Sequence, residues 1–115
     1  QFKGYPTEPQ AKAAYALDFF KNRLLAHFEK EEQILFPAIR KKTSVLDPLI
    51  EELLAEHERL RNMFLGLEGE TDPENKLDEM GHFLEKHVRK EERVFFQQVQ
   101  EILGEEKMED LKKSL

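Results

Sequence analysis

The chain has 115 residues, of which 37% are charged and 39% hydrophobic, with a formal net charge of −6 and no cysteine. This length suits one domain with a single core, and the missing cysteine excludes disulfides, thiolate catalysis and cysteine-ligated zinc or iron–sulfur sites. The negative charge argues against nucleic acid as a main partner. No stretch reaches the roughly 18 apolar residues of a membrane span, and no secretory signal pattern is present, so we expect a cytoplasmic protein without a membrane partner.

Residues 1–9, QFKGYPTEP, are predicted to form an irregular segment. They lack an initiator methionine, and we expect a processed or trimmed N-terminus. From Gln10 to Lys41, apolar residues recur at helical spacing and predict a first long helix. Pro37 lies inside this pattern and lacks a backbone N–H, so it is expected to kink or end the helix nearby.

A second helix is predicted to open at Asp47-Pro48, where an N-cap residue precedes a proline at the first helical position. It is expected to end near Gly69. The same kind of opening, Thr71-Asp72-Pro73, predicts a third long helix.

Gly104 is expected to end the third helix, and residues 105–115 are typical of a short closing helix with Met108 and Leu111 facing inward. No strand pattern is present. The sequence therefore predicts an all-α, up-down antiparallel helix bundle that forms one domain over residues 1–115.

A histidine stands at a core position of the apolar stripe in each long helix: His27, His57 and His87. In the first and third helices a glutamate four residues later, Glu31 or Glu91, takes the next core position. Residues i and i+4 lie about 40° apart around a helix, so each pair shares one face. Beyond the glutamates the stripes are expected to continue through Ile34, Leu35 and Ala38, and through Val94, Phe95 and Gln98.

The two histidine–glutamate motifs are near repeats, HFEKEEQILF at 27–36 and HVRKEERVFF at 87–96. A single such pair is common on exposed helix faces, and a lone histidine on an apolar face is more often a satisfied core residue than a ligand. The repeat is harder to explain as packing, and His57 on the intervening helix adds a third imidazole. Together these features favour a metal site.

Burying an unpaired carboxylate costs several kcal/mol unless it is paired or binds a cation. The stripes carry no lysine, so a metal ion would supply the compensating charge. Imidazole and carboxylate ligands together suit iron, manganese or zinc better than calcium or magnesium, and carboxylates from two helices can bridge two ions. The predicted ligands are His27, Glu31, His57, His87 and Glu91.

His82 is a weaker candidate ligand, because it is rotated about 140° from His87 around the helix. A surface or outer role is favoured for it. Three glutamates that lie off the stripes are expected at the rim of the site or in solvent: Glu32, Glu58 and Glu92. Arg61, one turn after His57, is expected to be a surface or gating residue and not a ligand.

Three segments resemble successive helices of the hemerythrin-like, or HHE cation-binding, domain family: LLAHFEKEEQILFPAI, LLAEHERLRNMF and FLEKHVRKEERVFF. The resemblance spans about Ala14 to Gln98, and the short acidic closing helix is similar to that of members of the bacterial branch. It implies an antiparallel four-helix bundle that holds a non-haem di-iron centre with bridging carboxylates.

By motif, His27 and Glu31 match the second family helix, His57 matches the third, and His87 and Glu91 match the fourth. Each of these residues is thereby implied to be an iron ligand. The resemblance thus supports the same five residues as the stripes do.

Two departures from the family pattern bear on function. Arg61 stands where oxygen-carrying members have a second histidine, so the chain is more similar to the sensing, iron-handling or iron–sulfur-repair branches. Nothing before His27 supplies the histidine of the family's first helix, which we expect to be missing or truncated in this chain. A second copy or His82 could complete the site, and a homodimer or swapped segment could cover the resulting apolar groove.

The leading functional hypothesis is a di-iron domain that senses or binds a small molecule such as dioxygen or nitric oxide, or that handles iron. The metal pair would lie in an apolar pocket lined by Phe28, Phe36, Phe64 and Phe95. Two alternatives stay open: a metal-free helical interaction module, and a di-iron oxidoreductase or peroxide-reducing enzyme. The sequence does not separate an enzyme from a sensor.

Overall fold

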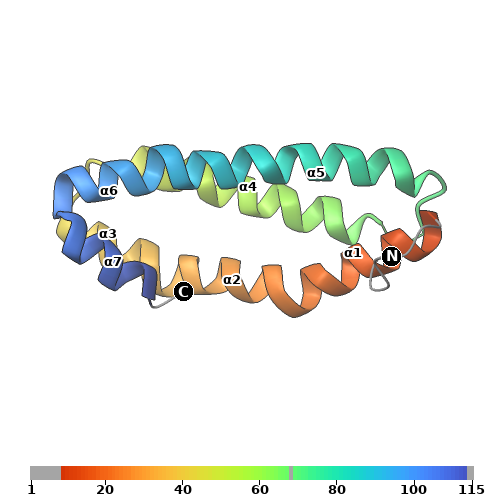
Figure 1. Ribbon diagram of the computed structural model, residues 1–115, viewed down its shortest axis with the longest axis horizontal. Helices are drawn as coiled ribbons and strands as arrows, with labels where there is room; N and C mark the ends of the chain where they lie inside the picture. The colour runs from red at the N-terminus through yellow and green to blue at the C-terminus, as the bar shows by residue number, and fades with distance from the viewer. Residues whose placement is uncertain (1–8, 68, 114–115) are drawn as a thin grey trace, which may run out of the picture.

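The computed structural model describes residues 9–67 and 69–113, which form three long helices and one short helix in an elongated bundle (Figure 1). The first long helix comprises α1 (Pro9–Phe19), η1 (Phe20–Leu24), α2 (Leu25–Lys30), η2 (Glu31–Leu35) and α3 (Phe36–Lys42). The others are α4 (Asp47–Leu65), then α5 (Pro73–Lys90) with η3 (Glu91–Phe95) and α6 (Phe96–Leu103), and finally α7 (Glu105–Lys113). The described residues contain no strand, and the predicted all-α bundle is confirmed.

The predicted helix ends agree with the structure to within a few residues. Of the segment predicted to be irregular, residues 1–8 lie outside the described part, and Pro9 opens α1. Asp47 is the first residue of α4 rather than its cap, and its carboxylate lies in the first turn, where the helix dipole favours negative charge. The helix ends at Leu65, before the predicted Gly69.

Gly104 separates α6 from α7, as predicted. Its φ of 93° and ψ of 157° fall in a region that is essentially restricted to glycine. The sharp turn lets α7 fold back towards α3 (Figure 1), and it places Met108 in the core.

The first long helix continues past Pro37 and ends five residues later, at Lys42, so Pro37 does not end it directly, and the predicted kink stays a prediction. Pro37 is the second residue of α3, directly after the π-helical turn η2, where bonding changes from i→i+5 to i→i+4. A missing N–H disturbs the regular ladder least at such a change. The corresponding turn η3 forms with Gln97 at the equivalent position, so the proline is not what produces the π turn.

The buried stripes advance by one residue after Glu31 and Glu91, contrary to the sequence expectation. Ile34 and Val94 are 47% and 41% exposed. Leu35 and Phe95, which were also expected in the stripes, are fully buried, and the next core positions are taken by Phe36 and Ile39 on the first long helix and by Phe96 and Val99 on the third.

The π turns η2 and η3 explain this advance. In each, the glutamate carbonyl accepts a hydrogen bond from the N–H five residues later, at Phe36 or Phe96. One extra residue is thereby accommodated in the turn, and i and i+5 come to lie on the same side. A regular α-helical count cannot predict this shift.

Two apolar clusters pack above and below a layer of buried polar side chains. The first cluster contains Leu35, Phe36, Ile39, Leu46, Ile50, Leu53, Phe95, Phe96, Val99 and Met108. The second contains Phe20, Phe28, Leu60, Phe64, Leu67 and Met80. Between them, the described part of the chain buries four polar or charged residues: Glu31, His57, His87 and Glu91.

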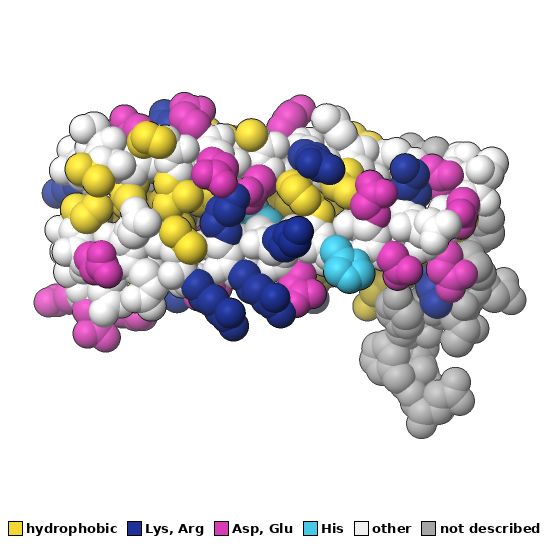
Figure 2. Space-filling model, turned by 90° about the horizontal axis from the view of Figure 1, so that it is seen from above, with side chains coloured by type: hydrophobic (Ala, Val, Ile, Leu, Met, Phe, Trp, Pro, Cys, Tyr) yellow, Lys and Arg dark blue, Asp and Glu magenta, His cyan; other side chains and the backbone are white. Residues whose placement is uncertain are grey.

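An apolar groove lies on the half of the bundle that contains α1 and the start of α5. It is lined by Tyr15, Ala16, Phe19, Phe64, Leu77, Met80, Gly81 and Leu84. Tyr15 and Phe19 are 44% and 42% exposed, and Figure 2 shows further hydrophobic side chains emerging between charged ones on the face seen from above. The homodimer or swapped segment that was expected to cover such a groove stays a prediction. Among the described residues, no helix is long and apolar enough to cross a membrane.

Candidate metal centre

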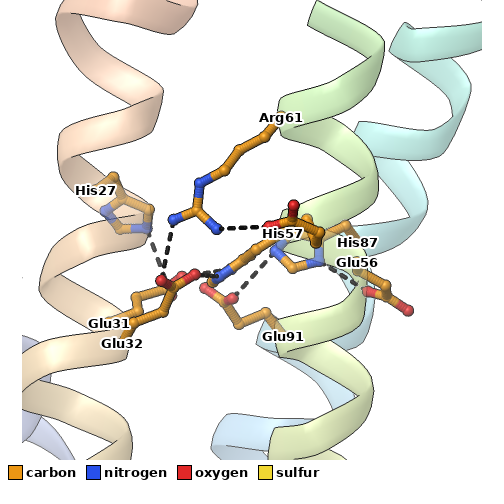
Figure 3. Close-up of polar contacts among 9 residues, drawn as sticks. His27, Glu31, Glu32, Glu56, His57, Arg61, His87 and Glu91 are labelled. Carbon is orange, nitrogen blue, oxygen red and sulfur yellow. Dashed lines mark hydrogen bonds and ion pairs between the residues drawn. The ribbon is translucent and has the colours of Figure 1, made fainter.

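Four buried side chains from three helices converge at the middle of the bundle (Figure 3). Glu31, His57, His87 and Glu91 each contribute one donor atom, and these atoms all lie within 4.8 Å of one another. His57 and Glu31 are fully inaccessible. The structure thus brings together four of the five residues that the sequence predicts as principal ligands.

The inward contacts are made by the Nε2 atoms of the imidazoles. Nε2 of His57 lies 3.0 Å from Oε1 of Glu31, and Nε2 of His87 lies 3.4 Å from Oε2 of Glu91. His27 approaches Glu31 from the same helix, with Nε2 3.5 Å from Oε2. Its side chain is 43% exposed, so it lies at the rim rather than within the buried group of four.

Several buried atoms of the group have no hydrogen-bond partner of good geometry: both carboxylate oxygens of Glu31, Nε2 of His57 and Oε2 of Glu91. Leaving such atoms unsatisfied costs about 1–3 kcal/mol each. Two nitrogen and two carboxylate donors that converge in this way fit a transition-metal cation. The residues present therefore suit the metal ion that the sequence predicted.

The two buried carboxylates titrate in opposite directions. Burial, and then the neighbouring Glu31, raise the pKa of Glu91 to about 7, despite the hydrogen bond from His87. Burial also disfavours ionised Glu31, but the polar contacts with His27 and His57 outweigh it and hold the pKa of Glu31 below its usual range. Without a cation, the pair thus holds a proton at pH values below about 7, and a bound metal would displace it.

The two inner histidines are each held from outside by a carboxylate. Nδ1 of His57 lies 2.7 Å from Oε2 of Glu32, and Nδ1 of His87 lies 2.7 Å from Oε1 of Glu56. Ionised carboxylates only accept hydrogen bonds, so each Nδ1 is the donor. Glu32 was expected to cap the rim or face solvent; it does not face solvent, because its side chain is 24% exposed and turns towards α4, where it contacts Nδ1 of His57.

Glu56 was missed by sequence reasoning altogether. It precedes His57 on α4 by one residue, and its carboxylate reaches across to His87 on α5. An acidic residue next to a core histidine is the only sequence signal, and it is weak, because acidic residues are frequent on exposed helix faces.

A basic side chain forms an ion pair with each of these two outer carboxylates, Glu32 and Glu56. Arg61 donates from Nη2 to Oε1 of Glu32 at 3.0 Å, and its guanidinium lies 5.7 Å from the centre of the Phe28 ring. Lys90 donates to Glu56, and also to the exposed Glu52. Arg61 was expected to be a surface or gating residue. Its side chain is 21% exposed and donates to the carboxylate that contacts His57.

The remaining candidates lie away from the buried group. His82 is exposed, with Nδ1 2.8 Å from the backbone oxygen of Asp78, and the structure does not bring it to the centre. Glu58 and Glu92 are exposed, as expected, and form ion pairs with Arg61 and Lys112 respectively.

Aromatic rings cover the imidazoles. Phe28 stacks on His57 and presents its ring to His87 edge-on, with centroids 5.9 Å apart. Phe36 lies 6.0 Å from His57 and contacts Phe95 at 5.5 Å. Phe64, the fourth member of the predicted pocket, instead stacks on Phe20 in the second apolar cluster, with ring centroids 4.8 Å apart.

Comparison of the chain with known proteins finds one protein family. The family model described as the hemerythrin HHE cation-binding domain matches residues 4–99, which is most of the chain. No curated protein and no solved structure matches the chain.

Proposed function

The chain belongs to the hemerythrin HHE cation-binding domain family, and from this premise we propose that its buried centre is a non-haem iron site of the dinuclear kind. The main support for this proposal is that Glu31, His57, His87 and Glu91 converge in the core. Several of their buried nitrogen and oxygen atoms lack hydrogen-bond partners and are therefore available to a metal ion. His27 would complete the ligand set from the rim. Zinc or manganese would be compatible with the same donors.

Each residue has a definable part in holding iron. Glu31 and Glu91 supply the negative charge and, from two helices, the carboxylates that could bridge two ions. His57 and His87 supply neutral nitrogen donors through Nε2. Phe28 and Phe36 pack on the imidazole of His57 and exclude water from that side.

Ferrous iron bound here would supply coordination positions for a small ligand such as dioxygen or nitric oxide. A sensing or iron-handling role is favoured over oxygen carriage, because Arg61 occupies the position of the second third-helix histidine. The guanidinium is committed to Glu32, and it cannot act as a metal ligand.

A metal-free helical module is the second candidate, and one observation favours it. Each inner imidazole already lies between two carboxylates, Glu31 and Glu32 for His57, and Glu56 and Glu91 for His87. Part of the buried charge is therefore compensated without any metal.

Loading with iron(II) under anaerobic conditions separates the candidates. Metal analysis and an optical spectrum should show at least one tightly bound iron per chain, and the His27→Ala and Glu91→Ala variants should lose iron while remaining helical. Glu58→Ala, a change on the exposed face of α4, is the matched control. Sub-stoichiometric iron in the whole protein, with equal thermal stability with and without a chelator, would support the metal-free module.

A further inference from the structure

Two chains of polar contacts with the same composition run from the surface to the buried centre, and Figure 3 labels their carboxylates and imidazoles. In the first, Arg61 binds Glu32, Glu32 binds Nδ1 of His57, and Nε2 of His57 faces Glu31. In the second, Lys90 binds Glu56, Glu56 binds Nδ1 of His87, and Nε2 of His87 faces Glu91. Each chain consists of a cation, a carboxylate, an imidazole and a buried carboxylate, and the two start on different helices.

We infer that Glu32 and Glu56 are positioning residues that keep a proton on Nδ1 of His57 and of His87, so that Nε2 presents its lone pair to the centre. The inference rests on the proposed metal-binding function. A neutral imidazole carries its proton on one nitrogen only, and the hydrogen bond made by one nitrogen decides which nitrogen is left to bind metal.

If a glutamine replaced Glu32 or Glu56, the neighbouring Arg61 or Lys90 would determine the orientation of its side-chain amide. Arg61 and Lys90 are donors only, and each contacts one oxygen of its carboxylate while the other oxygen accepts from the imidazole. In Glu32→Gln, the amide oxygen must therefore face Arg61, which leaves the amide NH2 facing Nδ1 of His57. That NH2 donates, so Nδ1 must become the acceptor and the ring proton must move to Nε2, where it blocks the metal.

The fixed environment of each ring makes this effect specific rather than a loss of packing. Phe28 stacks on His57 and restrains its ring plane, and a flip within that plane would turn a ring carbon, rather than Nε2, towards Glu31. The side chains of Glu32 and Glu56 are 24% and 15% exposed, so an isosteric amide leaves no cavity. A purely structural role would not move the ring proton.

The test reads the protonation of Nδ1 directly, in metal-free protein with ¹⁵N-labelled histidine, by two-bond ¹H–¹⁵N correlation spectra. Wild-type protein should show Nδ1 protonated in both inner rings. Glu32→Gln should remove the proton from Nδ1 of His57 alone, and Glu56→Gln from Nδ1 of His87 alone. Glu58→Gln and Glu52→Gln change acids that contact the same two cations but no imidazole, and they should alter neither ring.

Zinc(II) affinity, measured by competition with a chelator, gives the second readout. Glu32→Gln and Glu56→Gln should weaken binding by roughly 10- to 100-fold, and the two control variants should bind like wild type. Replacing the cation as well, in Glu32→Gln/Arg61→Met, frees the amide to turn its oxygen to Nδ1 and should recover most of the lost affinity.

Unchanged Nδ1 protonation in both glutamine variants, or no recovery in the double variant, would overturn the positioning role. A wild-type protein that binds neither zinc nor iron would instead overturn the proposed metal site. The two failures are distinguishable, because the Nδ1 readout is made without metal.

Discussion

The Phe28 ring lies parallel to the His57 imidazole, with ring centroids 4.0 Å apart and planes inclined by 13°. Phe28 is 1% exposed and follows His27 on the first long helix, so one residue both covers the metal centre and packs in the second apolar cluster. The fold and the site are thus coupled through this contact.

Replacing Phe28 should therefore weaken both stability and metal binding. Phe28→Leu keeps an apolar side chain but loses the stacked pair, which contributes about 0.5–1.5 kcal/mol beyond burial. We expect the free energy of unfolding to fall by about 1–2 kcal/mol, and the metal affinity to fall because the His57 ring is less confined. Urea denaturation and chelator competition measure the two effects. Phe19→Leu, at a half-exposed position, should change stability by no more than about 0.5 kcal/mol.

Glu91 makes the stability of the metal-free protein depend on pH. Its pKa is about 7 in the folded protein against 4.5 for the free side chain, so the folded state binds the proton more tightly than the unfolded state. The stability contributed by this proton is complete below pH 4.5 and is lost as the pH rises through 7. The difference corresponds to about 3 kcal/mol.

Glu91→Gln should accordingly make metal-free protein more stable than wild type at pH 8, by up to about 3 kcal/mol, while weakening metal binding. The uncharged amide resembles the protonated acid and cannot repel Glu31. Thermal unfolding between pH 4 and pH 9 tests this, with the exposed neighbour substitution Glu92→Gln as the control. Parallel pH profiles for wild type and Glu91→Gln would contradict the raised pKa of Glu91.

Metal affinity should rise with pH for the same reason. Binding must displace the proton from Glu91, so the apparent affinity should fall about tenfold for each pH unit below about 7. Hydrogen bonds to Glu91 and Glu56 outweigh burial and raise the pKa of His87, which steepens the dependence further. Zinc(II) titrations from pH 5.5 to 8.5 measure the slope, and a flat profile would argue against displacement of protons by the metal.

Two glycines should respond to alanine in opposite ways. Gly104 has a φ of 93°, which an L-residue adopts only with strain, so Gly104→Ala should destabilise the protein by about 1 kcal/mol or more. Gly81 lies within α5, and a Cβ added there meets no atom within 4 Å. Gly81→Ala should therefore stabilise by about 0.5–1 kcal/mol. Thermal unfolding of the two variants checks both signs.

The sequence predicted the bundle and its inner ligands because both depend on local periodicity. Apolar stripes in three helices identified Glu31, His57, His87 and Glu91, which are buried, and also His27, which lies at the rim. Proline and glycine marked most helix ends. The outer carboxylates were not predicted, because whether Glu32 or Glu56 reaches an imidazole depends on the distance and rotation between two helices. Glu92 has the same place in its motif as Glu32, yet it lies at the surface.

The stripes beyond the ligands were misplaced for a different reason. Ile34 and Val94 fit a regular α-helix, and only the π turns after Glu31 and Glu91 transfer burial to the following residue. Such turns have no simple composition signal. They begin at Glu31 and Glu91, so the same local departure from the α-helix positions these two proposed ligands and the core residues beyond them.

The polar layer also divides the hydrophobic interior in two. The two apolar clusters are separate, and the polar side chains between them are held by ion pairs and by aromatic contacts of His57 with Phe28 and Phe36. The domain thus resembles two short bundles joined end to end. A cation bound between them would couple their unfolding, because its ligands come from all three long helices. Without it, amide hydrogen exchange in the half that contains α1 could become independent of the half closed by α7.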